Sequence, residues 1–386
     1  MSGEPFVLPA ELEDFRSAVR AICEDRLAKR APEIDEQDEF PWDVHELFVE
    51  HDLMGVGYPE EHGGGGGGSL STAVMVEEIA RVSASASLIP LVSRLGAIPI
   101  MLAGSREQKD QLLGGIARGV HQMSYALTEP GSGSDAASMR TRYERTADGF
   151  RLSGTKRFIT NAGASDRYTV FATRDPDERS RGISAFVVHA EDPGFSVGKS
   201  ERKLGIRGSP TREVYLDGVE IPGDRLIGEE AQGFSHAMRT LDYSRPTIGA
   251  QALGIAQGAF DAAASYAAER EQFGRKISEF QGIQFLLADM AMQVEAARLL
   301  VYRAAAGCDA GDPRLTYFAS IAKAHAADTA MQVTTDAVQV LGGYGYMREY
   351  GVERMMRDAK ITQLYEGTNQ IQRLVTARQI LKPLTG

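Results

Sequence analysis

The sequence predicts an α+β fold of three successive domains: an N-terminal helical domain, a middle antiparallel β-barrel or sandwich, and a C-terminal helical bundle. Three observations predict it. Apolar residues recur at helical spacing in residues 1–122 and again in residues 232–386, whereas short β-rich runs fill residues 123–231. Because these strands follow one another without intervening helices, a doubly wound sheet and a TIM barrel are excluded.

The N-terminal zone contains several predicted helices. Four apolar residues spaced three or four apart form one helical stripe: Leu12, Phe15, Val19 and Ile22. Pro41 stands at the start of a second helix, since proline is favoured in the first helical turn. Further helices are predicted over 75–82 and 106–113, the latter with Ser105 and Gln108 spaced as a capping box.

Six consecutive glycines occupy positions 63–68, between the early helices. The run formally satisfies the G-x-G-x-x-G pattern of nucleotide-binding loops. However, no strand precedes it, and a homopolymer satisfies almost any glycine pattern. We therefore predict a flexible surface loop here rather than a phosphate cradle.

The middle zone contains hairpin signals. Runs 140–146 and 150–156 flank Asp148-Gly149, a dipeptide typical of tight hairpin turns. Residues 168–173 and 183–189 form two more β-rich runs, and Asp217-Gly218 is predicted as a second turn. Closely spaced strands with such turns favour a small antiparallel barrel or sandwich.

Long helices are predicted in the last zone. Ser278 and Gln281 are spaced as a capping box. A stripe of seven apolar residues follows: Ile283, Leu286, Leu287, Met290, Val294, Ala297 and Val301. A comparable helix spans 315–341, and shorter ones follow Val352 and Asn369. Long helices with short connections indicate a bundle.

The composition restricts the partners of the chain. Its 386 residues include 42 Lys and Arg against 53 Asp and Glu, a formal net charge of −11. Such a surface repels nucleic acids and anionic membranes, so neither is an expected partner. Cys23 and Cys308 are too few for a disulfide framework, and the seven histidines include no i, i+4 pair, so no metal site is expected.

The sequence favours a cytoplasmic location. The first fifteen residues lack the charged-then-apolar pattern of a signal peptide. The most apolar stretch, 88–103, contains Arg94 and is interrupted by Pro90 and Pro99. It falls short of the roughly 20 apolar residues that a bilayer span needs.

Glu366 is the carboxylate with the clearest catalytic potential. It lies between a helix predicted to end near Leu364 and another that begins near Asn369, with Tyr365 before it and Gly367 after it. A carboxylate at such a junction beside an aromatic ring can be desolvated, which raises its pKa toward neutrality, as a general base requires. The same residues are also compatible with a simpler interpretation, in which Glu366 is a solvated loop residue beside a glycine that caps the preceding helix.

Five further polar clusters are unusual, whereas the G-x-S-x-G motif of serine hydrolases is absent. TEPGSGSD at 128–135 offers backbone N–H groups and the hydroxyls of Thr128, Ser132 and Ser134 to a phosphate or a flavin edge. The others are FITNAG at 158–163, LDYSRP at 241–246, REQFG at 270–274 and QVLGGYGY at 339–346.

Together with YEGTNQIQR at 365–373, these clusters closely resemble the acyl-CoA dehydrogenase family of flavoenzymes, in this order and over residues 6–382. TEPGSGSD, and YEGTNQIQR with the preceding ERMMRDAKITQ, are the most specific motifs. The resemblance implies the family fold, whose C-terminal domain is a four-helix bundle. It also implies FAD between the β-domain and the C-terminal helices, partly bound by a neighbouring subunit, in a homotetramer built as a dimer of dimers.

The resemblance further implies a role for Glu366. It would remove the α-proton of an acyl-CoA thioester while the β-hydrogen leaves as hydride to flavin N5, giving a trans-2-enoyl-CoA. Charge that develops on the thioester oxygen would be held by the Glu366 N–H and a ribityl hydroxyl of the flavin. One branch of the family takes its base from the position of Ser244. Serine cannot serve as this base, so the branch with the base in YEGT is favoured.

The resemblance assigns FAD contacts to two groups of residues. The loop at the flavin edge and the other flavin wall correspond to Tyr125, Leu127, Thr128, Gly133, Ser134, Phe158, Ile159 and Thr160. The contacts to the adenine half and pyrophosphate of a neighbour's FAD correspond to Arg270, Phe273 and Gln281. The complementary loop corresponds to Gln339, Gly342 and Gly343, and two residues beside the base, Thr368 and Gln370, also face the cofactor. Phe158 replaces the tryptophan of most members, which affects ring stacking and the approach of the electron acceptor.

Substrate contacts are assigned in the same way. Those on the CoA side and around the base are Ser134, Asp242, Tyr243, Arg245, Tyr365 and Gly367. Leu88 and Leu91, on the helix near 85–95, are expected to line the acyl pocket and favour a short, medium or branched chain, although both could be core residues. Electron transfer flavoprotein is the expected electron acceptor, and fatty acid β-oxidation the expected setting.

Three alternatives stay open on the sequence alone. The first is a dehydrogenase for an acyl or aminoacyl thioester tethered to a carrier protein. The second is a flavin oxidase that reduces oxygen directly. The third is a catalytically silent flavoprotein that serves as a scaffold, against which the retention of Glu366 argues.

Overall fold

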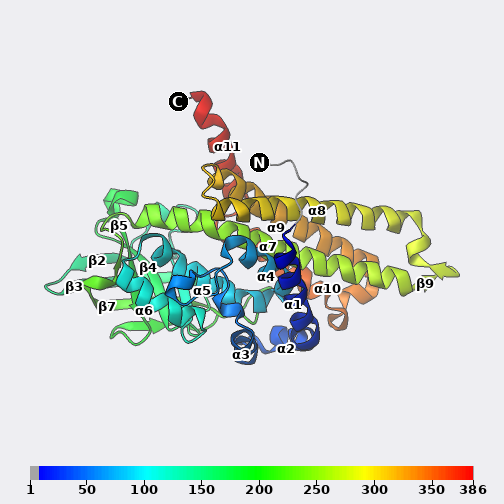
Figure 1. The fold of residues 1–386 in the computed structure, drawn as a ribbon, viewed down its shortest axis with the longest axis horizontal. Coiled ribbons are helices and arrows are strands. Elements are labelled where there is room, and N and C mark those ends of the chain that lie inside the picture. Colours follow the sequence, from blue (N-terminus) through cyan, green and yellow to red (C-terminus); the bar gives the residue numbers. More distant parts are fainter. Residues whose placement is uncertain (1–7, 386) are drawn as a thin grey trace.

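The computed structural model describes residues 8–385, so the first seven residues, included in the signal-peptide prediction, lie outside it. The described chain is elongated, with the sheet at one end and two long helices, α7 (Gly233–Glu269) and α8 (Gln281–Asp309), running toward the other (Figure 1). The helices confirm the predicted helix–β–helix order.

The remaining helices are α1 (Ala10–Ile22), α2 (Ala28–Gln37), α3 (Trp42–Glu50), α4 (Gly68–Val82), α5 (Ala84–Ala103), α6 (Arg106–Ala117), α9 (Leu315–Leu341), α10 (Val352–Thr362) and α11 (Asn369–Thr385). The strands are β1 (Met123–Ala126), β2 (Arg142–Arg145), β3 (Gly149–Thr160), β4 (Arg167–Thr173), β5 (Ile183–His189), β6 (Phe195–Val197), β7 (Thr211–Pro222), β8 (Leu226–Ile227), β9 (Glu271–Gln272) and β10 (Arg275–Lys276).

The start of α6 confirms the predicted capping box. The Ser105 side chain accepts from the Gln108 N–H at 3.2 Å, and the Gln108 side chain accepts from the Ser105 N–H at 3.0 Å. Both bonds satisfy N–H groups that a helix start otherwise leaves unpaired. Pro41 likewise precedes α3 as predicted, and its carbonyl accepts from the Val44 N–H.

We expect Ser105→Ala to lower the free energy of unfolding by about 1 kcal/mol, because the first turn of α6 loses its side-chain acceptor. Urea unfolding of the purified protein measures this loss. The control is Ser265→Ala, at an exposed position inside α7, where alanine is the better helix former and no loss is expected. Equal effects at the two positions would contradict the capping role.

The glycine run lies at the surface, as predicted, and it is packed against a neighbouring segment. Three backbone hydrogen bonds join it to residues 55–58: Gly57 N–H to Gly66 O, Gly65 N–H to Gly55 O, and Gly66 N–H to Tyr58 O. A Cβ added to Gly64 would lie 2.4 Å from Tyr58, so a larger residue does not fit there. Helix α4 begins at Gly68, inside the run and earlier than predicted.

The middle zone forms one eight-stranded sheet in the order β6-β7-β3-β2-β4-β5-β8, with β1 paired to β4. The Asp148-Gly149 hairpin is confirmed, since β2 and β3 pair antiparallel with Arg145 opposite Phe150. The sheet is mixed rather than wholly antiparallel, because β4 pairs parallel with both β1 and β2.

The second predicted turn, at Asp217-Gly218, is wrong. Both residues lie inside the continuous strand β7. The register steps from Leu152 opposite Val219 to Gly154 opposite Leu216, so β7 carries one extra residue here. The dipeptide therefore forms a β-bulge, in which Gly218 adopts a positive φ of 65°.

The capping box predicted at Ser278 is also wrong. Helix α8 begins at Gln281 behind Phe280, which provides no side-chain cap. Ser278 instead lies in a short 3-10 turn, where the Glu279 side chain accepts from the Lys276 N–H. The apolar stripe of α8 is nevertheless buried where it meets the bundle, as at Met290, Val294, Ala297 and Val301.

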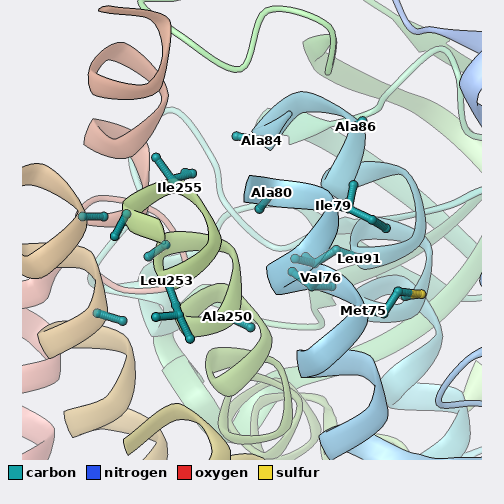
Figure 2. Close-up of a cluster of buried hydrophobic side chains, with 14 of the residues drawn as sticks. Met75, Val76, Ile79, Ala80, Ala84, Ala86, Leu91, Ala250, Leu253 and Ile255 are labelled. Carbon is teal, nitrogen blue, oxygen red and sulfur yellow. The ribbon is translucent and has the colours of Figure 1, made fainter. Parts of the chain in front are cut away.

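One hydrophobic core lies where α4, α5 and α7 meet (Figure 2). Val76 and Ile79 of α4 pack with Leu91 of α5 and Leu253 of α7, and all four side chains are nearly inaccessible to solvent. Pro90 and Pro99, which were expected to interrupt the apolar stretch 88–103, lie inside the continuous helix α5. By length and composition α5 could cross a membrane, yet 78% of its apolar window is buried inside the protein, as in a core helix.

Candidate active site

Glu366 lies in a strained turn between α10 and α11. Its φ is 52° and that of Gly367 is 89°, so two successive residues adopt the left-handed conformation. A non-glycine residue in this region costs on the order of 1–2 kcal/mol. Position 367 favours glycine, because a φ of 89° strains any other residue and a Cβ would displace the Gln372 amide nitrogen, 2.6 Å away.

Three side chains hold this turn by its carbonyl oxygens. Gln372 Nε2 donates to Glu366 O at 3.1 Å and to Gly367 O at 3.0 Å. Arg245 Nε donates to Glu366 O at 3.4 Å, and Lys323 Nζ donates to Gly367 O at 2.9 Å. These donors come from α11, α7 and α9, so helix packing maintains the strained backbone.

The Glu366 carboxylate faces α7 and α9. Burial raises its pKa to about 7 against three opposing effects: a hydrogen bond donated by Ser244 Oγ to Oε2, and the positive charges of Arg245 and Lys323. Without these three groups the carboxyl would be protonated at still higher pH. A carboxylate with a pKa near 7 is suited to general-base chemistry at neutral pH.

Arg245 is itself held by a partly buried carboxylate, that of Asp242. Its Nη1 donates to Asp242 Oδ1 at 2.8 Å, and Thr316 Oγ1 donates to Asp242 Oδ2 at 2.6 Å. The structure therefore brings Arg245, and Asp242 through it, to the Glu366 turn, while their contacts to substrate stay a prediction. Tyr243, by contrast, packs against Leu315 and Cys308 in a separate small cluster.

A hydrogen-bonded chain joins the turn to the start of α5. The Tyr365 hydroxyl donates to Gln251 Oε1 on α7. Gln251 Nε2 in turn donates to Ala84 O at 3.1 Å and to Ser87 Oγ at 3.0 Å. Gln251 and Ser87 are fully buried, so this chain runs through the interior of the protein.

Tyr125 on β1 reaches the same region. Its hydroxyl donates to Ala237 O of α7 at 3.5 Å, and its ring centroid lies 5.0 Å from that of Phe171. Burial, together with the negative charge of Glu366, raises the pKa of Tyr125 well above its usual value. The end of the sheet and the base therefore share one electrostatic environment.

The loop after β1 is tied to β3 by a buried ion pair. Lys156 Nζ donates to Glu129 Oε1 at 2.8 Å and to Leu127 O at 3.2 Å. The backbone adds a bond from the Arg157 N–H to Thr128 O at 2.8 Å. These contacts place Leu127 and Thr128 beside β3, and so bring together the two predicted flavin walls.

Phe158 and its neighbours in β3 point in different directions. Phe158 has a positive φ of 57° and a ring that is 57% exposed, with the Arg157 guanidinium 4.9 Å from the ring centroid. Ile159 is buried in the sheet core, so only its backbone is available to a cofactor. Gly133 and Ser134 are exposed, and a Cβ on Gly133 would meet open space.

A second group of predicted residues lies at the far end of the bundle, near β9 (Figure 1). Arg270, Gly342 and Gly343 line one pocket of about 470 Å³, in which the Arg270 guanidinium lies 5.3 Å from the Tyr344 ring centroid. Phe273 is 93% exposed, and Gln281 and Gln339 are also exposed. Arg245 and Arg270 are 25 residues apart along α7, about 37 Å, so one chain does not bring the two groups together.

The other predicted residues are placed as follows. Leu88 and Leu91 are buried in the core, where Leu91 packs with Val76 and Ile79 (Figure 2). Thr368 is half-buried, and its hydroxyl accepts from the Ile371 N–H at the start of α11. Gln370 is exposed. Among residues 8–385, no group of three or more His, Cys, Asp or Glu side chains could hold a metal ion.

Of the side chains that contact the base or its turn, Arg245 was expected from the sequence and others were not. Lys323, Gln372 and Gln251 were not singled out, and Ser244 was noted only as a position where some relatives carry the base. One signal was available for Lys323. It lies in a stripe of buried alanines on α9, and a lysine in an apolar stripe is rarely buried without a specific role.

Comparison with known proteins identifies the family. Family models of the acyl-CoA dehydrogenase N-terminal, middle and C-terminal domains match residues 9–120, 124–219 and 231–381. The chain is 54% identical to the probable acyl-CoA dehydrogenase FadE25 of Mycobacterium tuberculosis, over 99% of this chain and 98% of that protein.

Two solved structures share the fold over nearly the whole chain. Butyryl-CoA dehydrogenase from Megasphaera elsdenii is 42% identical with a TM-score of 0.95, covering 98% of this chain and all of that one. A chain in a structure described as electron transferring flavoprotein of Acidaminococcus fermentans is 43% identical with a TM-score of 0.96 and the same coverage. The protein therefore belongs to the acyl-CoA dehydrogenase family of FAD-dependent oxidoreductases.

Proposed function

We propose that the protein removes hydrogen from the α and β carbons of an acyl-CoA thioester, yielding a trans-2-enoyl-CoA, with Glu366 as the base that takes the α-proton. The observation that carries this proposal is the partly buried Glu366 carboxylate, which accepts a hydrogen bond from Ser244 and whose pKa burial raises to about 7. At neutral pH a substantial fraction of the carboxylate is ionised and ready to accept a proton. The Glu366 side chain keeps some solvent access, so it is open to a substrate.

The backbone of the same residue supports the proposal. The Glu366 and Gly367 carbonyls are directed into the protein by their bonds to Gln372, Arg245 and Lys323. Within the described residues, the Glu366 N–H donates to no protein acceptor. It is therefore available to the thioester oxygen, where negative charge develops as the α-proton leaves.

The residues present fit FAD. Gly131, Gly133, Gly342 and Gly343 leave open space where a Cβ would stand, so their backbone can approach a flat or phosphorylated group closely. When bound, FAD supplies the acceptor for the hydride from the β carbon. Thr128, Ser134 and the exposed Phe158 ring would hold its flavin end, and Arg270 with Gly342 and Gly343 an adenine and pyrophosphate end.

The separation of these two groups supports a shared site between subunits. Because Arg270 and Gly342 lie far from Glu366 in one chain, we assign their pocket to the FAD of a neighbouring copy, in the homotetramer that the resemblance implied. Leu374, Ile380 and Leu384 of the projecting α11 are more than half exposed, as expected for a surface that another copy covers (Figure 1). We place this enzyme in cytoplasmic fatty acid β-oxidation, with electron transfer flavoprotein as acceptor.

An anaerobic titration tests the reaction. The purified protein is mixed with acyl-CoAs of short, medium, long and branched chain, and the visible flavin band is followed. Bleaching by one range of chain lengths is the expected result. Bound flavin that no acyl-CoA bleaches would contradict the proposal and favour a carrier-tethered thioester, which the same assay with acyl-pantetheine carrier protein would reveal. Stoichiometric hydrogen peroxide in air would instead indicate an oxidase.

The Ser244 hydroxyl provides a prediction about pH. Ser244→Ala removes a hydrogen bond to the ionised carboxylate, so the pKa of Glu366 rises further above about 7. The rate of flavin bleaching then rises with pH through a higher midpoint than in the wild type, by about half a pH unit. Stopped-flow rates between pH 6 and pH 9 measure this shift, and an unchanged midpoint would show that the bond does not influence the base.

A further inference from the structure

Lys323 is a fully buried lysine that contacts the Glu366-Gly367 turn. It lies in the middle of α9, on a face otherwise formed by small residues such as Ala319, Ala322 and Ala326. Its Nζ donates to Gly367 O at 2.9 Å and to Asn369 Oδ1 at 3.1 Å. An ammonium group buried among alanines is costly unless its bonds and a neighbouring negative charge offset the loss of water.

The position of Lys323 ties it to Glu366 in two ways. Its hydrogen bond fixes the carbonyl of the residue that follows the base, and so stabilises the left-handed turn that aims the carboxylate. Burial lowers the pKa of Lys323 to about 7, and the negative charge of Glu366 opposes this effect, so each group favours the charged form of the other. Neither effect requires Lys323 to touch the substrate.

We infer that Lys323 is a positioning residue for the proposed reaction: its ammonium group holds the Glu366-Gly367 turn through the Gly367 carbonyl, and its charge favours the ionised form of the base. The inference rests on the proposed function of Glu366. The buried pair has no net charge when Glu366 is ionised and Lys323 protonated. In that state each charge offsets the burial of the other.

The charged groups around the pair do not replace this effect. Arg245 on α7 also faces Glu366, but its Nη1 is paired with Asp242. On the other side of Lys323, Asp328 is occupied by Arg373, Asn369 and Gln363. Tyr125 and Tyr365 face Glu366 as neutral phenols, because burial raises the pKa of each well above its usual value. Of the two cations that act on Glu366, Arg245 is therefore paired with Asp242, whereas Lys323 forms no ion pair of its own among the residues described.

Two variants separate the hydrogen bond from the charge. Lys323→Gln retains an N–H donor without the charge, and Lys323→Met removes both while keeping an unbranched side chain. Loss of the charge raises the pKa of Glu366, so we expect the acid limb of the pH profile for flavin bleaching to move up by about one pH unit in both variants. Below the midpoint this is about a tenfold loss of rate. Lys323→Met loses rate at high pH as well, because the turn is less firmly held.

The matched control is Lys29→Met, at an exposed position on α2 where the lysine is 77% accessible. It removes the same charge from the chain and should leave the midpoint unchanged. If Lys323 had a purely structural role, its replacement would lower the melting temperature without moving the midpoint of the pH profile for flavin bleaching. Variants that retain flavin but keep the wild-type midpoint would therefore overturn the inference.

A measurement without turnover keeps this inference distinct from the proposed reaction. The folded-state pKa of Glu366, about 7, exceeds its ordinary value of 4.5, so the folded state binds more protons between these values and loses stability as pH rises through them. Glu366→Gln removes this loss. The melting-temperature advantage of Glu366→Gln should therefore grow from pH 4.5 and level off near pH 7.

In the K323Q background the same advantage should level off about one pH unit higher, since the folded-state pKa of Glu366 is higher there. If this advantage levels off at the same pH in both backgrounds, the inference is overturned, even if the protein proves inactive with every acyl-CoA. A shifted plateau in a protein that acyl-CoA does not bleach would support the role of Lys323 and contradict only the proposed reaction.

Discussion

Glu366→Gln abolishes the reduction of bound FAD by acyl-CoA while the protein remains folded and yellow. The amide matches the carboxylate in size, and it can still accept the hydrogen bond from Ser244. It cannot take up a proton at any accessible pH. Loss of a positioned general base lowers the rate by on the order of 10²–10⁴. Stopped-flow bleaching with the best acyl-CoA of the panel measures this decrease.

The turn itself should survive this substitution. The bonds from Gln372, Arg245 and Lys323 reach backbone carbonyls, which the side-chain change does not alter. Flavin content and the binding of acyl-CoA should accordingly remain near the wild-type values. Glu11→Gln, at an exposed position on α1, is the control for loss of one carboxylate and should retain full activity. Turnover that persists in Glu366→Gln would disprove the assigned base.

Lys156→Met lowers the free energy of unfolding by about 3 kcal/mol, because it leaves the Glu129 carboxylate buried without its cation. Burial alone would raise the pKa of Glu129, and Lys156, Thr141 and the Arg140 N–H together lower it. A carboxylate with a lowered folded-state pKa stabilises the fold above its ordinary pKa and ceases to do so as it becomes protonated. The difference in the free energy of unfolding between Lys156→Met and the wild type should therefore become smaller as the pH falls.

The same strand supplies the control. Arg151→Met breaks an ion pair with Glu220 whose side chains are 49% and 63% exposed, and solvent-exposed pairs contribute less than about 1 kcal/mol. Chemical denaturation of the FAD-loaded protein compares the two variants. Lys156→Met should also weaken FAD retention, since Lys156 holds the Leu127 carbonyl next to the proposed flavin wall. Equal losses in the two variants would contradict a special role for the buried pair.

Most helices and the first hairpin could be predicted because their signals are local. The capping box of α6 and the Asp148-Gly149 turn depend on residues within a few positions of one another. The Asp217-Gly218 error has the opposite cause. An aspartate–glycine pair suits a hairpin turn and a bulge equally well, and the choice between them depends on pairing with β3, which is distant in sequence.

The candidate site shows the same division. Glu366 could be identified because its motif is contiguous. The hydrogen bond from Ser244 could not be predicted, because Ser244 lies 122 residues away and reaches the carboxylate only when α7 packs beside the turn. The left-handed backbone of Glu366 also has no sequence signal of its own, since glutamate rarely adopts it. Tertiary packing imposes that conformation.

The hydrogen-bonded chain from Tyr365 through Gln251 to α5 has a consequence for the divergence of this enzyme. Ala84 and Ser87, which accept from Gln251, lie on the same helix as Leu88 and Leu91, two core residues that were predicted from the sequence to line the acyl pocket. Adaptation of α5 to another acyl chain would move these acceptors and, through Gln251, the tyrosine next to the base. Inherited changes of substrate preference would then require compensating substitutions at 251 or 365, so specificity and catalytic rate would evolve as one trait.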